Sequence, residues 1–135
     1  MSTRTFSRSA AAEGLTERIN AIDLLDERVR RSASPAGPTE PGRYLEVQGP
    51  GQSLLVPLEE GVTRVGRGLA ADLRLNEDSV SRRHAMLICD ESGARILDDR
   101  SSNGTFVNGQ RVEQAELKHG DVLELGRVLL RYLEV

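Results

Sequence analysis

Short runs of alternating apolar and polar residues, separated by turn residues, fill the chain from residue 43 to residue 135. Two tight turns stand out: Gly49-Pro50-Gly51 separates the first two runs, and Asn108-Gly109 separates two later ones. The Asn-Gly pair suits the positive φ angles of a two-residue hairpin turn. Short strands, about ten in number and regularly spaced, are typical of a β-sandwich, so the pattern predicts an all-β fold.

The first 42 of the 135 residues follow a different pattern and are predicted to form an N-terminal extension to a sandwich domain at residues 43–135. Residues 1–12 are small, polar and basic, and we expect them to be disordered. Residues 32–42 contain three prolines and two glycines, which favours a linker over a helix or a strand.

Between these two segments an amphipathic helix is predicted over about residues 15–31. Its apolar residues recur at intervals of three or four and form one stripe: Leu15, Ile19, Ile22, Leu25 and Val29. A helix of about 17 residues is marginal alone in water, so the stripe needs a partner. Two alternatives stay open: the helix packs on its own domain or frays, or it self-associates or binds a partner protein.

Composition excludes several classes of function. The net charge of −3 provides no basic field to attract nucleic acid. The single cysteine, Cys89, rules out an intramolecular disulfide and a cysteine-based zinc site, and its apolar surroundings indicate a buried residue. No apolar run approaches the roughly 20 residues of a membrane span, and the N-terminus lacks the apolar stretch of a signal peptide. We therefore expect a cytoplasmic protein that uses no cofactor or metal and binds neither membrane nor nucleic acid.

Three short polar segments lie where one predicted strand ends and the next begins: residues 65–67, 80–84 and 100–105. They supply guanidinium groups, hydroxyls, a side-chain amide and glycines. A phosphomonoester carries close to two negative charges and three acceptor oxygens, so its binding site must offer donors fixed in advance. Guanidinium forks, hydroxyls and backbone amides are such donors. The loops therefore predict an anion-binding site held by a β scaffold.

The loop motifs occur in a fixed order. Gly66-Arg67 comes first, followed by Ser81-Arg82-Arg83-His84, Asn103-Gly104-Thr105, Asn108-Gly109 and finally Gly120-Asp121. Each motif alone is weak, but the ordered set on an all-β background resembles the forkhead-associated (FHA) domain, a reader of phosphothreonine peptides. The resemblance covers residues 43–135. It implies an all-β, FHA-type sandwich of about eleven strands that presents its binding loops at one end.

The resemblance also implies a role for each loop residue. Arg67 and Ser81 match the positions that grip the phosphate, and Arg82 matches one that contacts phosphate or peptide backbone. Asn103 matches the residue that holds the peptide main chain, and Ser102 stands where the family often has threonine. Three further residues match positions that support the site: Gly66, His84 and Gly104. The family has no catalytic residues.

Several nearby polar residues are expected to be structural. Arg83 is expected on the surface, because it follows another arginine and neighbours on a strand point to opposite sides. His84 is expected to be a hydrogen-bonded structural residue rather than a metal ligand or a base, and His119 is assigned to a turn. Asp98 and Asp99 are expected at a solvated strand end rather than as paired carboxylates for acid–base chemistry.

The sequence therefore favours a phosphothreonine-dependent interaction module that binds a phosphothreonine-containing protein, with a Ser/Thr kinase or its substrate as partner. The alternative is a regulatory or scaffold protein whose sandwich binds a folded partner without phosphate. An enzyme is disfavoured, because the sequence offers no nucleophile–base pair, metal cluster or phosphate-binding glycine loop before a helix. Three loop residues are candidates for specificity beyond the phosphothreonine: Leu69, Arg100 and Arg127.

Overall fold

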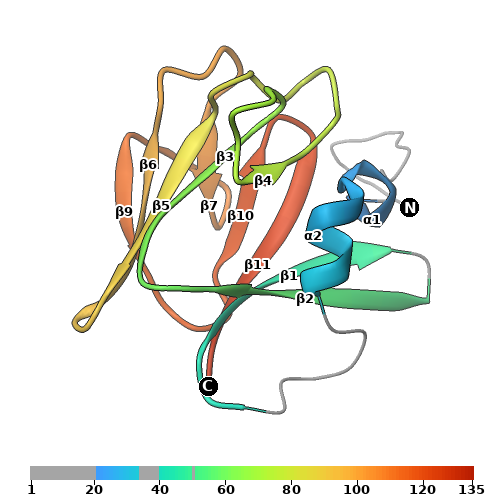
Figure 1. The fold of residues 1–135 in the computed structure, drawn as a ribbon. Helices are drawn as coiled ribbons and strands as arrows, with labels where there is room; N and C mark the ends of the chain where they lie inside the picture. Colours follow the sequence, from blue (N-terminus) through green and yellow to red (C-terminus); the bar gives the residue numbers. More distant parts are fainter. Residues whose placement is uncertain (1–20, 34–39, 50) are drawn as a thin grey trace, which may run out of the picture.

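The computed structural model describes residues 21–33, 40–49 and 51–135. In this part of the chain eleven strands form two sheets that pack face to face, so the all-β sandwich prediction is confirmed (Figure 1). The strands are β1 (Arg43–Gly49), β2 (Gln52–Leu58), β3 (Gly61–Gly66), β4 (Leu73–Arg74), β5 (Ala85–Asp90), β6 (Gly93–Asp98), β7 (Thr105–Val107), β8 (Gln110–Val112), β9 (Gln114–Leu117), β10 (Val122–Leu125) and β11 (Val128–Glu134).

The two sheets differ in size. The six-stranded sheet has the order β2-β1-β11-β10-β7-β8, and the five-stranded sheet has the order β4-β3-β5-β6-β9. The pairs are antiparallel except for the short parallel pair of β3 and β4. The first and last strands, β1 and β11, lie side by side, so the two ends of the sandwich sequence are joined in one sheet.

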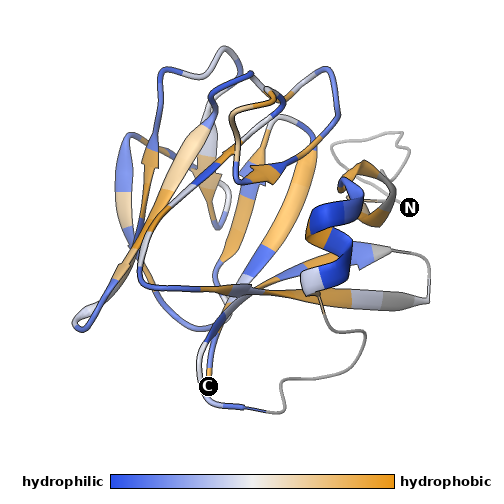
Figure 2. Ribbon diagram, in the orientation of Figure 1, coloured by the Kyte–Doolittle hydropathy of each residue, from blue (hydrophilic) through white to orange (hydrophobic). Residues whose placement is uncertain are grey.

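The core lies between the sheets and follows from the period of two in the sequence, since alternate strand residues point to the same face. The inward residues of two central strands show this: Ala85, Leu87 and Cys89 on β5, and Val128, Leu130 and Tyr132 on β11. Figure 2 shows the alternation as orange bands along the strands. Cys89 is buried as expected, and burial raises the pKa of its thiol.

The strands that flank both predicted tight turns pair with each other. β1 and β2 pair up to Gly49 and Gln52, on either side of the first turn. Asn108 and Gly109 have φ angles of 51° and 84° and connect β7 to β8. Asn108 also accepts a hydrogen bond from the Val122 amide at 2.9 Å through its side chain, which ties this hairpin to β10.

The sequence carries no clear strand signal over β9. β9 forms the edge of the five-stranded sheet beside β6. Its residues Gln114 and Glu116 are exposed, and Leu117 is its one fully buried residue. An edge strand that faces solvent carries a weak apolar alternation, so its sequence did not stand out from a loop.

The helix predicted over residues 15–31 is interrupted in its described part. The structure has two short helices, α1 (Ala21–Leu24) and α2 (Glu27–Ser32). Leu25 leaves the helix to form an isolated bridge with Leu75. Asp26 then caps the second helix, because its side chain accepts a hydrogen bond from the Val29 amide at 3.0 Å. Residues 15–20, the predicted tail at 1–12 and the linker residues 34–39 lie outside the described residues.

The two helices pack on the chain's own sandwich. Ile22, Leu25 and Val29 from the predicted stripe are buried and belong to the same core cluster as the strands. Figure 1 shows α1 and α2 beside β1, β2 and β4. The described part of the stripe is therefore already covered by apolar partners, and the described part of the predicted extension is not independent of the sandwich.

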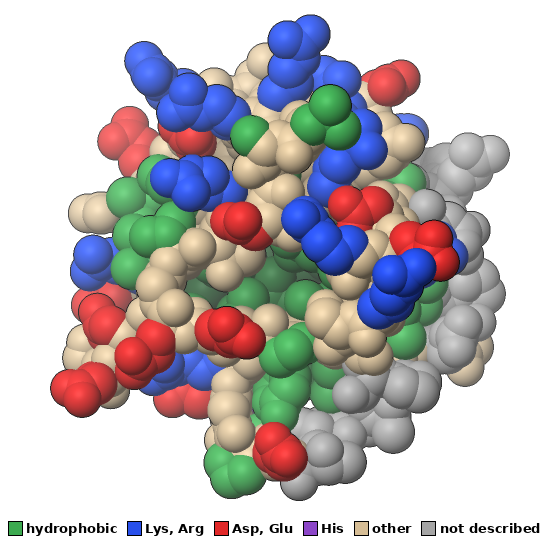
Figure 3. Space-filling model, in the orientation of Figure 1, with side chains coloured by type: hydrophobic (Ala, Val, Ile, Leu, Met, Phe, Trp, Pro, Cys, Tyr) green, Lys and Arg blue, Asp and Glu red, His purple; other side chains and the backbone are tan. Residues whose placement is uncertain are grey.

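The polar segments singled out in the sequence gather at one end of the sandwich. The β3–β4, β4–β5 and β6–β7 connections lie together at the top of Figure 1, with the β10–β11 turn nearby. Figure 3 shows Lys and Arg side chains gathered over this end of the molecule.

Candidate functional site

The end of β3 and the β4–β5 loop run side by side and form the floor of the candidate site. The amide of Arg67 donates to the Ser81 carbonyl at 2.9 Å, and the amide of Gly68 donates to the Arg82 carbonyl at 3.1 Å. A side chain at Gly66 would collide with the Arg82 carbonyl, so the close approach of these two backbones requires glycine there.

The side chain of Arg67 is half-buried, and a hydrogen bond from its Nε fixes the position of the guanidinium group. Its Nε donates to the Val80 carbonyl at 2.9 Å. The two terminal nitrogens make no hydrogen bond or ion pair with the described residues. A guanidinium anchored through Nε keeps its planar fork available for an external anion.

Ser81 connects two of the loops. Its Oγ accepts a hydrogen bond from the Ser102 amide at 2.9 Å. The hydroxyl hydrogen of Ser81 is therefore left to donate elsewhere, and the group lies beside the residues that hold Arg67.

His84 joins the same two loops from below and is completely buried. Its Nδ1 accepts from the Ser81 amide at 3.0 Å, and its Nε2 donates to the Gly104 carbonyl at 2.9 Å. This pairing needs the neutral ring with its proton on Nε2. Burial lowers the pKa of His84, more than the Gly104 carbonyl and the nearby Asp98 charge raise it. The expected structural histidine thus connects the two loops.

Asn103 projects from the β6–β7 loop and is exposed. Its side-chain nitrogen donates to the Ser79 carbonyl at 2.8 Å. Its side-chain oxygen accepts no hydrogen bond from the described residues, so it is available to a peptide amide. Gly104 follows with a φ of 93°, and a side chain there would lie 2.9 Å from Nε of Arg111.

The other sequence-predicted residues lie on the rim of the same loops. Arg82 and Ser102 are exposed, and their side chains bond to none of the described residues. Arg83 is a surface residue, as expected, and pairs with Asp99 at 3.1 Å. His119 lies in a turn, as expected, and accepts a hydrogen bond from the Glu134 amide at 3.0 Å.

Asp98 lies at the end of β6, as expected, but its carboxylate is hydrogen-bonded within the protein rather than solvated. Asp98 is half-buried and organises the β6–β7 loop. It accepts from the Ser101 hydroxyl at 2.5 Å, the Ser101 amide at 3.1 Å and the Thr105 hydroxyl at 2.7 Å. Partial burial raises the pKa of Asp98, but these hydrogen bonds together lower it by more. The pKa of Asp98 therefore lies below its ordinary value. The local signal was an aspartate followed three residues later by serine, a common side-chain-to-backbone turn.

The three candidate specificity residues occupy different surroundings. Leu69 is 87% exposed in the β3–β4 connection. Arg100 is exposed with a φ of 59°, an uncommon conformation for a residue with a side chain. Arg127 lies in the β10–β11 turn and pairs with Glu77 at 2.8 Å. Glu77 and Ser79, which contact these loops, were not recognised from the sequence.

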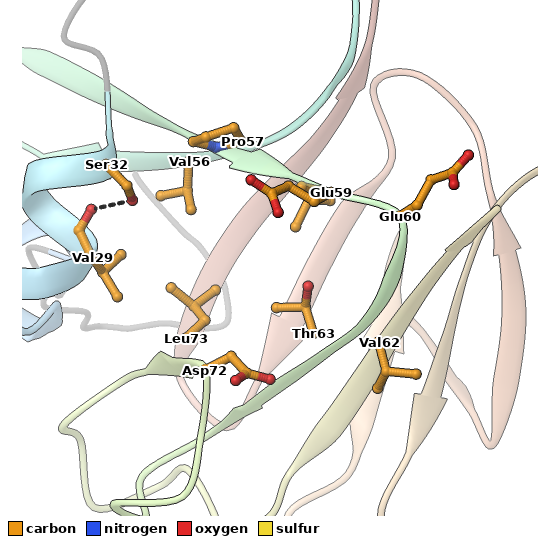
Figure 4. Close-up of a pocket in the computed structure, with 11 residues that line it drawn as sticks. Val29, Ser32, Val56, Pro57, Glu59, Glu60, Val62, Thr63, Asp72 and Leu73 are labelled. Carbon is orange, nitrogen blue, oxygen red and sulfur yellow. Dashed lines mark hydrogen bonds between the residues drawn. The ribbon is translucent and has the colours of Figure 1, made fainter. Parts of the chain in front are cut away.

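A separate groove of about 300 Å³ lies away from the loop end (Figure 4). It runs between α2 and the connection from β2 to β3, with Val29, Val56 and Leu73 among its apolar residues and Glu59 and Glu60 among its acidic ones.

Over residues 21–33, 40–49 and 51–135 no group of His, Cys, Asp or Glu side chains is placed to hold a metal. Nor does any helix in those ranges have the length and apolar character of a membrane span.

Several known proteins are similar to this chain in sequence and in fold. A family model described as "Inner membrane component of T3SS, cytoplasmic domain" matches residues 46–134. The oxoglutarate dehydrogenase inhibitor of Corynebacterium jeikeium is 31% identical over 140 residues, which cover 98% of this chain and 96% of the inhibitor. A solved structure from a structural and functional analysis of phosphothreonine-dependent FHA domain interactions has 35% identity and a TM-score of 0.62, and the match covers 69% of this chain and 96% of that chain.

The chain belongs to the FHA domain family. FHA domains are also found as parts of larger proteins. The ABC transporter ATP-binding/permease protein Rv1747 of Mycobacterium tuberculosis is 39% identical over 106 residues, which are 76% of this chain but 12% of the transporter. The match to this chain therefore covers a small part of that transporter and nearly all of the Corynebacterium inhibitor.

Proposed function

We propose that this FHA domain is an interaction module that binds phosphothreonine peptides at its loop end. The observation that carries the proposal is the guanidinium of Arg67, anchored by Nε on the Val80 carbonyl with its terminal nitrogens available. Ser81 lies on the segment whose backbone is hydrogen-bonded to that of Arg67, and its hydroxyl supplies a second donor. Phosphothreonine-dependent binding by a related FHA domain supports the same ligand class.

Each loop residue then has a task. Arg67 and Ser81 bind the phosphate, since a guanidinium fork and a hydroxyl together satisfy several of its oxygens. Arg82 adds a rim cation near the phosphate or the peptide backbone. Asn103 accepts a peptide amide through its side-chain oxygen. Ser102 adds an exposed hydroxyl and, through its amide, keeps Ser81 in place.

The partner would be a phosphothreonine-containing protein, with a Ser/Thr kinase supplying the phosphate or its substrate carrying it, in the cytoplasm. The domain itself would recruit and would carry out no chemistry. Calorimetric titration with a degenerate phosphothreonine peptide library, followed by the best sequence and its unphosphorylated twin, tests this function. Micromolar or tighter binding of the phosphorylated peptide alone supports it. Equal binding of the two twins would exclude it.

A second candidate is phosphate-independent regulation of a folded partner. The Corynebacterium relative, which this chain matches over 96% of its length, is an oxoglutarate dehydrogenase inhibitor, a name that points to control of an enzyme. Under this candidate the unphosphorylated chain would bind a folded enzyme, and Arg67→Ala would leave that binding unchanged. Under the leading proposal Arg67→Ala weakens binding to the phosphorylated partner at least tenfold.

A further inference from the structure

Ser79 lies at the junction of three loops around the candidate site. It belongs to the β4–β5 loop and accepts the side-chain amide of Asn103, from the β6–β7 loop, on its carbonyl at 2.8 Å. Its Oγ accepts the backbone amide of Arg127, from the β10–β11 turn, at 2.8 Å. A side chain at Gly126 would collide with the Ser79 carbonyl, so this turn is packed closely against Ser79.

Glu77 fixes Ser79 in this position. Its Oε2 accepts the Ser79 amide at 2.9 Å and also the Ser79 hydroxyl. Its Oε1 pairs with the Arg127 guanidinium at 2.8 Å. The Glu77 side chain is only 9% exposed, so the carboxylate is shielded from water where these bonds form. Hydrogen bonds to a shielded carboxylate contribute more than those at an open surface.

The contacts form one chain from Glu77 through Ser79 to Asn103. Asn103 itself is exposed, and its side chain has one hydrogen bond to the described residues, the one to Ser79. A side-chain amide at the surface samples several rotamers unless a bond selects one. The position of the Ser79 carbonyl therefore decides which way the Asn103 oxygen points.

We propose that Glu77 is a positioning residue for ligand binding: through Ser79 it orients the Asn103 side chain toward the peptide main chain. The inference rests on the proposed phosphopeptide function. In this proposal Glu77 does not contact the ligand, and its negative charge lies in the β4–β5 loop beside the proposed phosphate site. Its charge alone opposes phosphate binding, so any favourable contribution of Glu77 must come through the contacts that it makes.

The charge of Glu77 and its proposed positioning role predict opposite changes in phosphopeptide affinity when Glu77 is replaced, and this difference can be tested. Removal of any carboxylate near the site strengthens phosphate binding through the Coulomb term. Asp78→Ala is the matched control, since Asp78 is the exposed neighbour of Glu77. We expect Asp78→Ala to bind a phosphothreonine peptide as tightly as the parent or slightly tighter. We expect Glu77→Ala to bind it roughly fivefold more weakly.

A double-mutant cycle separates positioning from general loop damage. If Glu77 acts through Asn103, Glu77→Ala weakens binding in the parent but changes it less than twofold in an Asn103→Ala background. Ser79→Ala, which removes the hydroxyl that links Glu77 to Arg127, serves as the second variant should Glu77→Ala unfold the loop. An equal loss in both backgrounds, or a gain in affinity with Glu77→Ala, would overturn the proposal.

The side-chain amide of Asn103 gives a readout without any ligand. In NMR spectra of the parent we expect two resolved Nδ2 hydrogen resonances, one shifted by the bond to the Ser79 carbonyl. Glu77→Ala should move these resonances, and Asp78→Ala should leave them in place. Unchanged resonances in Glu77→Ala refute the positioning role. Should the parent itself not bind the phosphopeptide, the proposed function fails, and the orientation of Asn103 is decided by this spectrum alone.

Discussion

The imidazole of His84 donates a hydrogen bond to the Gly104 carbonyl at 2.9 Å while its other nitrogen holds the Ser81 amide at 3.0 Å. One buried ring therefore sets the separation of the two loops that carry Ser81 and Asn103. The residues that face the ligand in our proposal lie on the surface, and the residue that spaces them lies in the core. Two predictions follow from this position of His84.

Replacement of His84 by alanine should lower the thermal midpoint of unfolding by several degrees. The Ser81 amide and the Gly104 carbonyl lose their partner, and an unsatisfied buried polar group costs about 1–3 kcal/mol. His119→Ala is the control, since His119 is exposed and accepts one surface hydrogen bond. Calorimetric melting curves of both variants check the prediction. Equal midpoints for the two variants would show that His84 does not brace the loops.

Acidification should destabilise the domain through the same residue. Burial lowers the pKa of folded His84 below the ordinary value of 6.5. As the pH falls through about 6.5, the unfolded chain takes up a proton that the folded chain does not, so stability decreases from there down to the folded pKa. Urea unfolding at pH 7.5 and pH 5.5 measures the loss. His84→Gln should flatten this dependence and His119→Gln should not; the reverse pattern would assign the effect to His119.

Gly66→Ala should destabilise the domain and displace the β4–β5 loop. The added methyl group would meet the Arg82 carbonyl, a backbone atom that cannot rotate away. Overpacking of this kind costs about 1–3 kcal/mol. Gly68→Ala is a graded control, since its methyl group would lie 3.2 Å from the same carbonyl and need a much smaller shift. Urea unfolding ranks the two variants, and an equal or larger loss for Gly68→Ala contradicts the close approach at Gly66.

Asn103→Ala should separate binding from stability. The variant loses one exposed hydrogen bond, to the Ser79 carbonyl, so its thermal midpoint should stay close to that of the parent. Its affinity for a phosphothreonine peptide should fall severalfold, because the contact to the peptide main chain is lost. Melting curves and peptide titrations of the same sample check both parts. A large loss of stability with unchanged affinity would reverse the roles of Asn103 and His84.

Strands and turns could be predicted because their signals are local. The alternation on β5 and the Asn108-Gly109 turn each depend on neighbouring residues and the geometry of one element. The loops carrying Arg67, Ser81 and Asn103 were recognised because several short motifs occur in order. The strand β9 could not be predicted, because its outward residues face solvent at a sheet edge and its sequence shows little apolar alternation.

What escaped the sequence depends on contacts between distant segments. Glu77 and Arg127 are 50 positions apart, and nothing near either residue indicates that they pair. The break between α1 and α2 likewise depends on Leu25 reaching Leu75 on the sandwich, although Asp26 is a suitable cap within the periodic run. The hydrogen bond from the Thr105 hydroxyl to Asp98 joins the two ends of the β6–β7 loop, and the sequence does not indicate that these ends are in contact.

The central claim is that Arg67 binds a phosphate. Titration calorimetry of a phosphothreonine peptide into the parent, Arg67→Ala and Arg95→Ala tests it most directly, since Arg95 is an exposed arginine on β6 and controls for the loss of one charge. A charge-assisted hydrogen bond contributes about 1.5–3 kcal/mol, and a tenfold change in affinity is about 1.4 kcal/mol. We predict that Arg67→Ala binds at least tenfold more weakly than the parent while Arg95→Ala binds as the parent does. Equal affinities for the parent and a folded Arg67→Ala would contradict the account.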